Sequence, residues 1–161
     1  MQDFYEPKVG DVAPDFRLPS TRGKEMSLRE HKGKDVILYF YPKDDTPGCT
    51  AEACSFRDHE SDLTKEHAVV LGVSIDSPES HEQFRAKHNL NFPLLSDQTA
   101  DVAKMYGVWK EKNLYGRRTW GVARTTFWIG ADGRIKKIWK KVDTARHAEQ
   151  VLEELHAARA K

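Results

Sequence analysis

This sequence shows no disulfide framework, no apolar run long enough to span a membrane and no secretory signal. Only two cysteines occur among 161 residues, which excludes the cysteine-rich framework of small secreted proteins. No apolar run approaches the roughly 18 residues that cross a bilayer. The N-terminus lacks the basic segment and apolar stretch of a secretory signal. We therefore expect a cytoplasmic protein whose two cysteines are catalytic or metal-binding rather than structural.

The chain also lacks an excess of charge of either sign. Its 26 lysines and arginines against 25 aspartates and glutamates give a net charge of +1, which is no electrostatic footprint for nucleic acid or an anionic membrane. The nearest approach to a basic aromatic patch is Arg117-Arg118, close to Tyr115 and Trp120. One arginine pair neutralises few phosphates, so a solvated loop is the favoured interpretation, with no nucleic-acid or membrane partner.

Repeats, low-complexity tracts and Gly/Ser-rich linkers are absent too. Hydrophobic residues make up 39% and charged residues 32% of the chain, a balance typical of a globular protein with its own core. We therefore expect one domain over residues 1–161.

Two continuous apolar runs, 36–41 and 69–75, predict strands that are buried on both faces. A helix is predicted from Thr46-Pro47 to about residue 66, because Thr at the N-cap and Pro at the first helical position are start signals. The next segments predict a helix from Ser77-Pro78 to about 89, a short edge strand at 92–95 and a short helix at 100–106. An irregular stretch at 108–119 is expected to precede two strands, at about 122–129 and 134–139, that are joined by an Asp132-Gly133 turn. The last element is a C-terminal helix with Ala148, Val151, Leu152 and Leu155 on one face.

This order, βαβαβα followed by a hairpin and a helix, is typical of an α/β domain. The hairpin makes the central sheet mixed, and helices are expected on both of its faces. A thioredoxin-like sandwich is the simplest fold with this order of elements.

The segment most informative about function contains both cysteines, Cys49 and Cys54. With Thr46 as the N-cap, Cys49 occupies the third helical position, beside unpaired backbone N–H groups and the positive end of the helix dipole. Both features favour the thiolate, which is the reactive form of cysteine. A reactive thiol at Cys49 is therefore predicted.

A thiolate that attacks a peroxide must expel an alkoxide or hydroxide, so hydrogen-bond donors are needed where that charge develops. Thr46 offers a hydroxyl, and a guanidinium serves best as a permanent cation with several donors. Arg124 opens the apolar segment 124–129, which is predicted to lie in the same sheet as 36–41. Arg124 is therefore a candidate donor toward Cys49, and the alternative is that it simply pairs with a carboxylate.

Pro42, Thr46 and Cys49, spaced as P-x-x-x-T-x-x-C, together with the distant Arg124, resemble the active-site signature of peroxiredoxins. The longer string YPKDDTPGCTAEACSFRD, at 41–58, is similar to the peroxiredoxin Q / bacterioferritin comigratory protein group. The likeness covers nearly the whole chain, from 9–16 to the C-terminal helix.

The resemblance implies a role for each matching residue. Cys49 would be the peroxidatic nucleophile, Thr46 and Arg124 would orient and polarise the peroxide, and Pro42 would shield the thiolate. Cys54 would resolve the Cys49 sulfenic acid as an intramolecular disulfide, which thioredoxin or a similar dithiol protein would reduce. The implied enzyme is a monomeric thiol peroxidase for hydrogen peroxide and organic hydroperoxides that needs no metal, haem or flavin cofactor.

Several alternatives compete with these roles. The cysteines could be buried and inert, or Cys49, Cys54 and His59 could bind zinc, although no second Cys/His pair completes a tetrahedral set. A disulfide oxidoreductase usually has C-x-x-C rather than the longer spacing found here. After the thiol peroxidase and the disulfide oxidoreductase, a binding module without catalytic activity is the third possible function.

Other polar and aromatic residues have simpler interpretations. Asp44-Asp45 is expected in a solvent-facing loop, where negative charge suits the following helix start. The remaining predictions are that the histidines at 31, 59, 67, 81, 88, 147 and 156 are solvated, and that the tryptophans at 109, 120, 128 and 139 serve packing.

Overall fold

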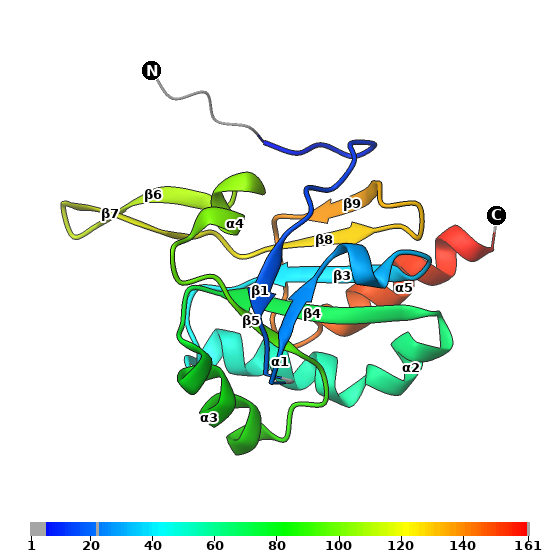
Figure 1. The fold of residues 1–161 in the computed structure, drawn as a ribbon, viewed down its shortest axis with the longest axis horizontal. Coiled ribbons are helices and arrows are strands. Elements are labelled where there is room, and N and C mark those ends of the chain that lie inside the picture. Colours follow the sequence, from blue (N-terminus) through cyan, green and yellow to red (C-terminus); the bar gives the residue numbers. More distant parts are fainter. Residues whose placement is uncertain (1–5, 22, 161) are drawn as a thin grey trace.

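A five-stranded mixed sheet forms the centre of the molecule (Figure 1) in a computed structural model that describes residues 6–21 and 23–160. The central β3 pairs in parallel with β4, and β4 pairs in parallel with β5. On its other side β3 pairs antiparallel with β8, which is followed by β9. The sheet order is β5 (Leu94–Ser96), β4 (Ala68–Ser74), β3 (Asp35–Phe40), β8 (Thr125–Ile129) and β9 (Ile135–Trp139).

The register of β3 against β8 brings two distant parts of the chain together. Phe40, the last residue of β3, pairs with Thr125, the first residue of β8. Arg124 immediately precedes β8, and the segment that leads to Cys49 immediately follows β3. The expectation that the segment opened by Arg124 lies in the same sheet as residues 36–41 is confirmed.

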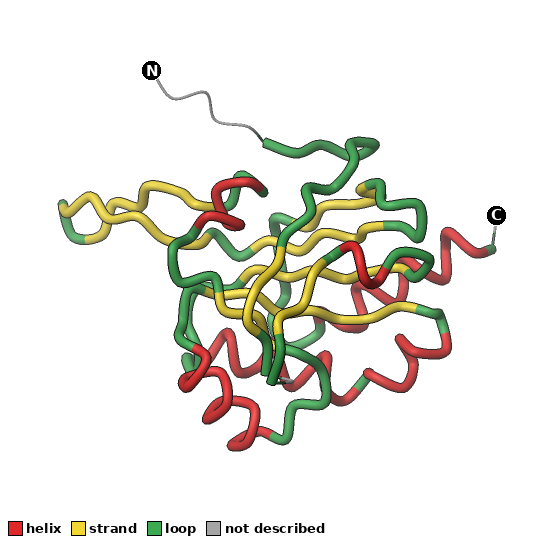
Figure 2. The backbone as a smooth tube through the Cα atoms, viewed as in Figure 1, coloured by secondary structure: helices red, strands yellow, loops and turns green. Residues whose placement is uncertain are grey.

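One face of the sheet is covered by α1 (Pro47–Asp58), α2 (Glu60–Lys65), α3 (Pro78–His88) and α5 (His147–Arg159). Figure 2 shows most of the helical chain gathered on this side. The helices and the sheet share one buried cluster, because alternate residues of β3 point toward them. The cluster includes Ile37 and Tyr39 of β3, Ala53 and Phe56 of α1, and Val151 and Leu155 of α5.

The opposite face is covered by smaller elements: the hairpin of β1 (Arg17–Pro19) and β2 (Glu25–Ser27), the short 3-10 helix η1 (Arg29–His31), and α4 (Asp101–Met105). Val36, Leu38 and Phe40 of β3 point to this side and pack with Tyr106 and Phe127. The mixed sheet with helices on both faces therefore agrees with the predicted architecture. Within the described residues, no helix has the length and apolar character needed to cross a membrane.

Three element predictions are wrong in detail. The stretch 108–119 is not irregular, because β6 (Trp109–Leu114) and β7 (Arg117–Val122) form a separate two-stranded hairpin that projects from the body (Figure 1). The strand predicted at 122–129 is divided between β7 and β8, with Arg124 in the break. The helix predicted from Thr46 to about residue 66 ends at Asp58 and resumes as α2 after His59.

Candidate active site

Cys49 lies in the first turn of α1, which follows β3 after a short loop. Thr46 is the N-cap residue, with extended backbone angles of φ −91° and ψ 156°, and Pro47 is the first helical residue. Cys49 is therefore the third residue of the helix, as predicted, and it is 1% exposed. Its sulfur lies in the first turn, where backbone N–H groups lack helical partners and favour a negative charge.

Arg124 contacts both the Cys49 sulfur and the buried carboxylate of Glu52. Its Nη2 donates a hydrogen bond to Cys49 Sγ at 3.2 Å, and its Nη1 donates to Glu52 Oε1 at 2.6 Å. Although burial lowers the pKa of Arg124, the charges of Glu52 and Cys49 raise it above its ordinary value. The guanidinium is thus a cation beside the thiol. The ion pair of Arg124 with a carboxylate is observed, and its catalytic role stays a prediction.

Glu52 is the residue that the sequence-based interpretation missed. It lies one helical turn after Cys49 on α1, and its side chain is fully buried. Burial raises the pKa of Glu52 to about 7, and the attraction of Arg124 offsets only part of that effect. The available signal was the i,i+3 spacing, which puts Cys49 and Glu52 on one side of the helix.

A neutral histidine lies behind this ion pair. His147 of α5 is fully buried, and its Nε2 is 2.7 Å from Thr126 Oγ1 and 3.9 Å from Glu52 Oε2. Its Nδ1 donates to Gln150 Oε1 at 2.9 Å, since that oxygen also accepts from the Asp143 amide. Burial lowers the pKa of His147 to about 4, so its Nε2 accepts the Thr126 hydroxyl hydrogen. Through these contacts His147 connects α5 to Thr126 of β8 and lies beside Glu52.

Gly48 leaves room for the arginine. A Cβ atom built on Gly48 would lie 3.3 Å from Arg124 Nη2, closer than an ordinary van der Waals contact. The first turn of α1 therefore approaches the guanidinium closely because position 48 has no side chain.

Thr46 and Pro42 lie in the loop between β3 and α1, and both are half-buried. The Thr46 hydroxyl donates to the Lys43 carbonyl at 2.8 Å and makes no capping hydrogen bond. Within the part of the chain that the structure describes, neither side chain hydrogen-bonds the Cys49 sulfur. Their predicted roles toward peroxide stay predictions.

Cys54 lies farther along the same helix and is half-buried. Both cysteines are free thiols. The alternative zinc site at Cys49, Cys54 and His59 gains no support, because among the described residues these three do not bring their ligand atoms together. The only group of three potential ligands within the described residues is elsewhere, at Asp44, Asp76 and His81.

The predicted solvation of Asp44 and of all seven histidines is wrong in part. Asp44 is buried, whereas its neighbour Asp45 is exposed and pairs with Lys87. His81 and His147 are also buried. These polar groups are inside because partners from other elements satisfy their hydrogen bonds, which is the condition for burial of a polar side chain.

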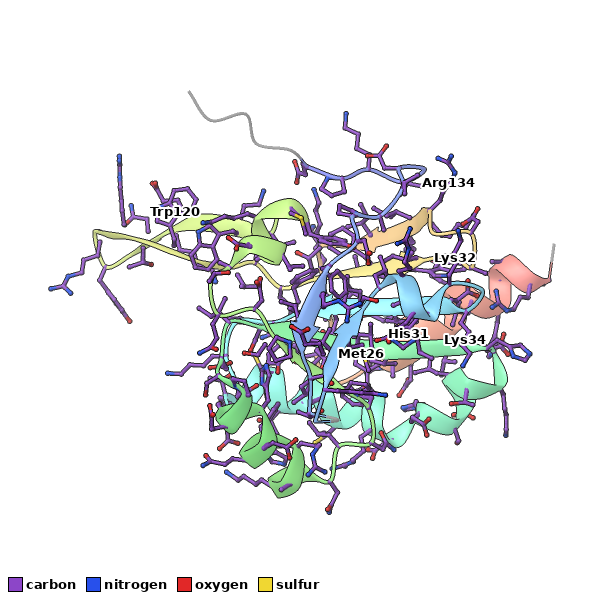
Figure 3. The ribbon with its side chains drawn as sticks, in the orientation of Figure 1. Met26, His31, Lys32, Lys34, Trp120 and Arg134 are labelled. Carbon is purple, nitrogen blue, oxygen red and sulfur yellow. The ribbon has the colours of Figure 1, made fainter. Side chains whose placement is uncertain are left out.

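The tryptophans divide in a similar way. Trp128 and Trp139 are buried in the core, as predicted, but Trp120 is 46% exposed on the projecting hairpin (Figure 3).

A separate hollow of about 190 Å³ is lined by Lys32 and Lys34 among others. It contains neither cysteine, and Figure 3 shows both lysines away from the hairpin.

These contacts place a cysteine beside a partly buried cation on a thioredoxin-like sandwich, an arrangement typical of cysteine-based enzymes rather than of inert thiols. Residues 9–138 match the model of the AhpC/TSA family, and the chain belongs to that family. Peroxiredoxin Bcp of Bacillus subtilis is 45% identical over 148 residues, which are 92% of this chain and 94% of the relative. Peroxiredoxin Bcp of Escherichia coli is 43% identical over 145 residues, 90% and 93% of the two chains.

Solved structures agree with the sequence relatives. The bacterioferritin comigratory protein of Xanthomonas campestris, studied for alkyl peroxide reduction, has a TM-score of 0.87 at 39% identity and covers 94% of this chain and 97% of its own. A mutant of Xylella fastidiosa PrxQ has a TM-score of 0.90 at 36% identity, with 96% and 99% covered. The predicted resemblance to the peroxiredoxin Q / bacterioferritin comigratory protein group, the thioredoxin-like fold and the thiol peroxidase class are confirmed.

Proposed function

We propose that this protein reduces hydrogen peroxide and organic hydroperoxides with the Cys49 thiolate and recycles through a disulfide between Cys49 and Cys54. The observation that carries the proposal is the contact of Arg124 with both Cys49 Sγ and Glu52 Oε1. A guanidinium held by a buried carboxylate is a preorganised donor, and such donors stabilise developing charge without reorganisation.

In the first step the Cys49 thiolate attacks one peroxide oxygen, and the O–O bond breaks as the S–O bond forms. The sulfur loses two electrons and becomes a sulfenic acid, while the second oxygen leaves as an alkoxide or hydroxide and takes up a proton. Arg124 would stabilise this charge, and its Nη2 at 3.2 Å from Cys49 Sγ supports that role. Because the Thr46 hydroxyl hydrogen is used by the Lys43 carbonyl, Thr46 would accept a hydrogen bond from the peroxide O–H, and Pro42 would keep water from the thiolate.

In the second step the Cys54 thiolate attacks the oxidised sulfur, the S–S bond forms and hydroxide leaves as water. Both cysteines lie on α1, so this helix must open locally before the bond closes. Local opening near the start of a helix is inexpensive compared with global unfolding. The same opening would expose the disulfide to its reductant.

A dithiol protein such as thioredoxin suits the reduction that completes the cycle. Thiol–disulfide exchange requires a thiolate to reach one sulfur of the disulfide, and an opened α1 would allow that approach. The protein would act as a monomer in the cytoplasm, where such reductants keep thiols reduced.

The test is peroxide consumption in the presence of a thioredoxin reducing system, compared with reduction of insulin disulfides. We expect rapid peroxide consumption and no insulin reduction above background. Insulin reduction without peroxide consumption would instead identify a disulfide oxidoreductase and contradict the proposal.

A further inference from the structure

The loop at 41–46, which leads from β3 to Cys49, is anchored by the buried carboxylate of Asp44. Its Oδ1 accepts a hydrogen bond from the Tyr41 hydroxyl at 2.6 Å, and its Oδ2 accepts one from the Ser80 hydroxyl at 2.8 Å. Oδ2 also lies 2.7 Å from Nδ1 of His81. The Asp44 and His81 side chains are 4% and 1% exposed, and the proposed chemistry uses neither of them.

His81 connects this carboxylate to β5, the strand at one edge of the sheet. Its Nε2 lies 3.0 Å from the carbonyl oxygen of Leu95 in β5. A carbonyl and a carboxylate only accept hydrogen bonds, whereas a neutral imidazole carries a single N–H. Nε2 must donate to Leu95, so a further proton lies between Nδ1 and Asp44 Oδ2. The 2.7 Å contact between Nδ1 and Oδ2 is therefore a hydrogen bond that ties His81 to Asp44.

A metal ion is the competing explanation, because atoms of Asp44, Asp76 and His81 lie within 4.8 Å of one another. However, Asp76 Oδ2 accepts from the Ser74 hydroxyl at 2.7 Å and from the Asp44 amide at 2.8 Å. The carboxylate oxygens that face the cluster already have hydrogen-bond donors. The geometry favours a proton-linked anchor over a cation site.

The loop needs such an anchor because its backbone is strained. Asp45 has a φ of 60°, in the left-handed region, which Asp enters more readily than most L-residues but which still costs energy. Such conformations persist where the surrounding structure holds them. The carboxylate of Asp45 pairs with Lys87 and His88, but these contacts are solvent-exposed and exposed pairs contribute little. The buried contact of Asp44 with α3 is the stronger restraint.

We propose that His81 is a positioning residue for peroxide reduction. By holding Asp44, it fixes the segment in which Pro42 precedes Asp44 by two residues and Thr46 follows it by two. The inference rests on the proposed function, since it concerns the geometry in which peroxide meets Cys49. His81 touches no reacting atom and acts only through the loop.

The test compares two reactions of Cys49 in His81→Gln: oxidation by hydrogen peroxide and alkylation by iodoacetamide. Alkylation needs the thiolate but no peroxide-binding contacts. We expect the ratio of the oxidation rate to the alkylation rate to fall about 10- to 100-fold, because small misplacements of positioning groups have effects of this size. Asp45→Asn, which removes only exposed contacts of the same loop, is the matched control and should keep the wild-type ratio.

A double-mutant cycle with Asp44→Ala provides the second arm. If the two residues act as one unit, Asp44→Ala/His81→Gln loses no more than about threefold beyond the worse single variant. NMR of the wild-type imidazole should show protons on both ring nitrogens or an N–H···O proton shared with Asp44. If His81→Gln unfolds, Asp44→Ala and Ser80→Ala are measured against the same alkylation reference.

An unchanged ratio in a folded His81→Gln or Asp44→Ala variant would overturn the inference, as would additive losses in the cycle. Tight binding of Zn²⁺ or Mn²⁺ that is lost in Asp44→Ala would also overturn it in favour of the cation site. Failure of the proposed function is distinguishable, because wild-type Cys49 would then react with peroxide no faster than an ordinary thiol.

Discussion

Cys49 and Cys54 lie on one continuous helix, α1, and are five residues apart. Five helical residues correspond to a rise of about 7.5 Å and a rotation of about 140°. A disulfide requires a Cα separation of roughly 4.4–6.8 Å and converging Cβ atoms. The two thiols therefore point to different sides of the intact helix, and the proposed disulfide is incompatible with this helix as it stands.

Oxidation should consequently unwind part of α1. Hydrogen exchange should show lower amide protection within about residues 49–58 in the disulfide form than in the reduced form, because the helical hydrogen bonds there must open. Peroxide-treated Cys54→Ser, which cannot form the bond, is the control and should keep its protection. Unchanged protection in a sample whose mass shows the intramolecular disulfide would refute the opening.

Arg124 should matter for the reaction in addition to its ion pair with the buried Glu52. We expect Arg124→Ala to slow Cys49 oxidation about 10²-fold or more, the effect of losing one preorganised donor. Stopped-flow oxidation of the reduced protein measures this rate. Arg85→Ala, which removes an exposed arginine paired with Glu82, should react like the wild type. A near-wild-type rate for Arg124→Ala would leave Arg124 only as the ion-pair partner of Glu52.

Glu52 should make stability depend on pH in a defined direction. Its pKa rises from 4.5 to about 7 on burial, so the folded state binds more protons than the unfolded state between these values. Stability from this group is fully present below about pH 4.5 and is lost as the pH rises toward 7. Glu52→Gln removes the titration, so its stability relative to the wild type should increase by on the order of 3 kcal/mol across this window.

Urea unfolding at a series of pH values measures that difference. Because His147 titrates in both proteins, its own contribution largely cancels in the comparison. Glu149→Gln, at an exposed site paired with Arg146, is the control and should show no such trend. A stability difference between Glu52→Gln and the wild type that is flat from pH 4.5 to 7 would show that Glu52 is not buried as a titrating acid.

The structural features that could be predicted from the sequence are those that depend on local pattern. The apolar run of β3, the Thr46-Pro47 helix start and the Asp132-Gly133 turn each follow from backbone preferences of neighbouring residues. Cys49 could be placed in the first turn because a helix start fixes the next few positions. Arg124 could be related to Cys49 only through the expected pairing of two strands.

The burial of polar side chains was not predictable in this way. Asp44 meets His81 across 37 positions, and His147 meets Thr126 across 21. A polar residue is buried when a partner from another element satisfies it, and no local pattern identifies that partner. For Glu52 the i,i+3 spacing from Cys49 was a local signal, but its partner Arg124 is 72 positions away, so its burial was missed for the same reason.

The hairpin of β6 and β7 was missed for a different reason. Both faces of most of β7 are exposed, so the sequence shows no alternation of apolar and polar residues there. Its turn uses Tyr115 and Gly116, both with positive φ, instead of the Asn-Gly or Asp-Gly pair that signals such turns.

Mass spectrometry of single-cysteine variants after one equivalent of hydrogen peroxide tests whether Cys49 is the residue oxidised by peroxide and Cys54 the one that resolves it. We expect Cys49→Ser to stay reduced. We expect Cys54→Ser to form a Cys49 sulfenic acid, prone to over-oxidation and mixed disulfides because nothing resolves it. Rapid oxidation of Cys54 in Cys49→Ser, with Cys49 unreacted in Cys54→Ser, would reverse these two roles.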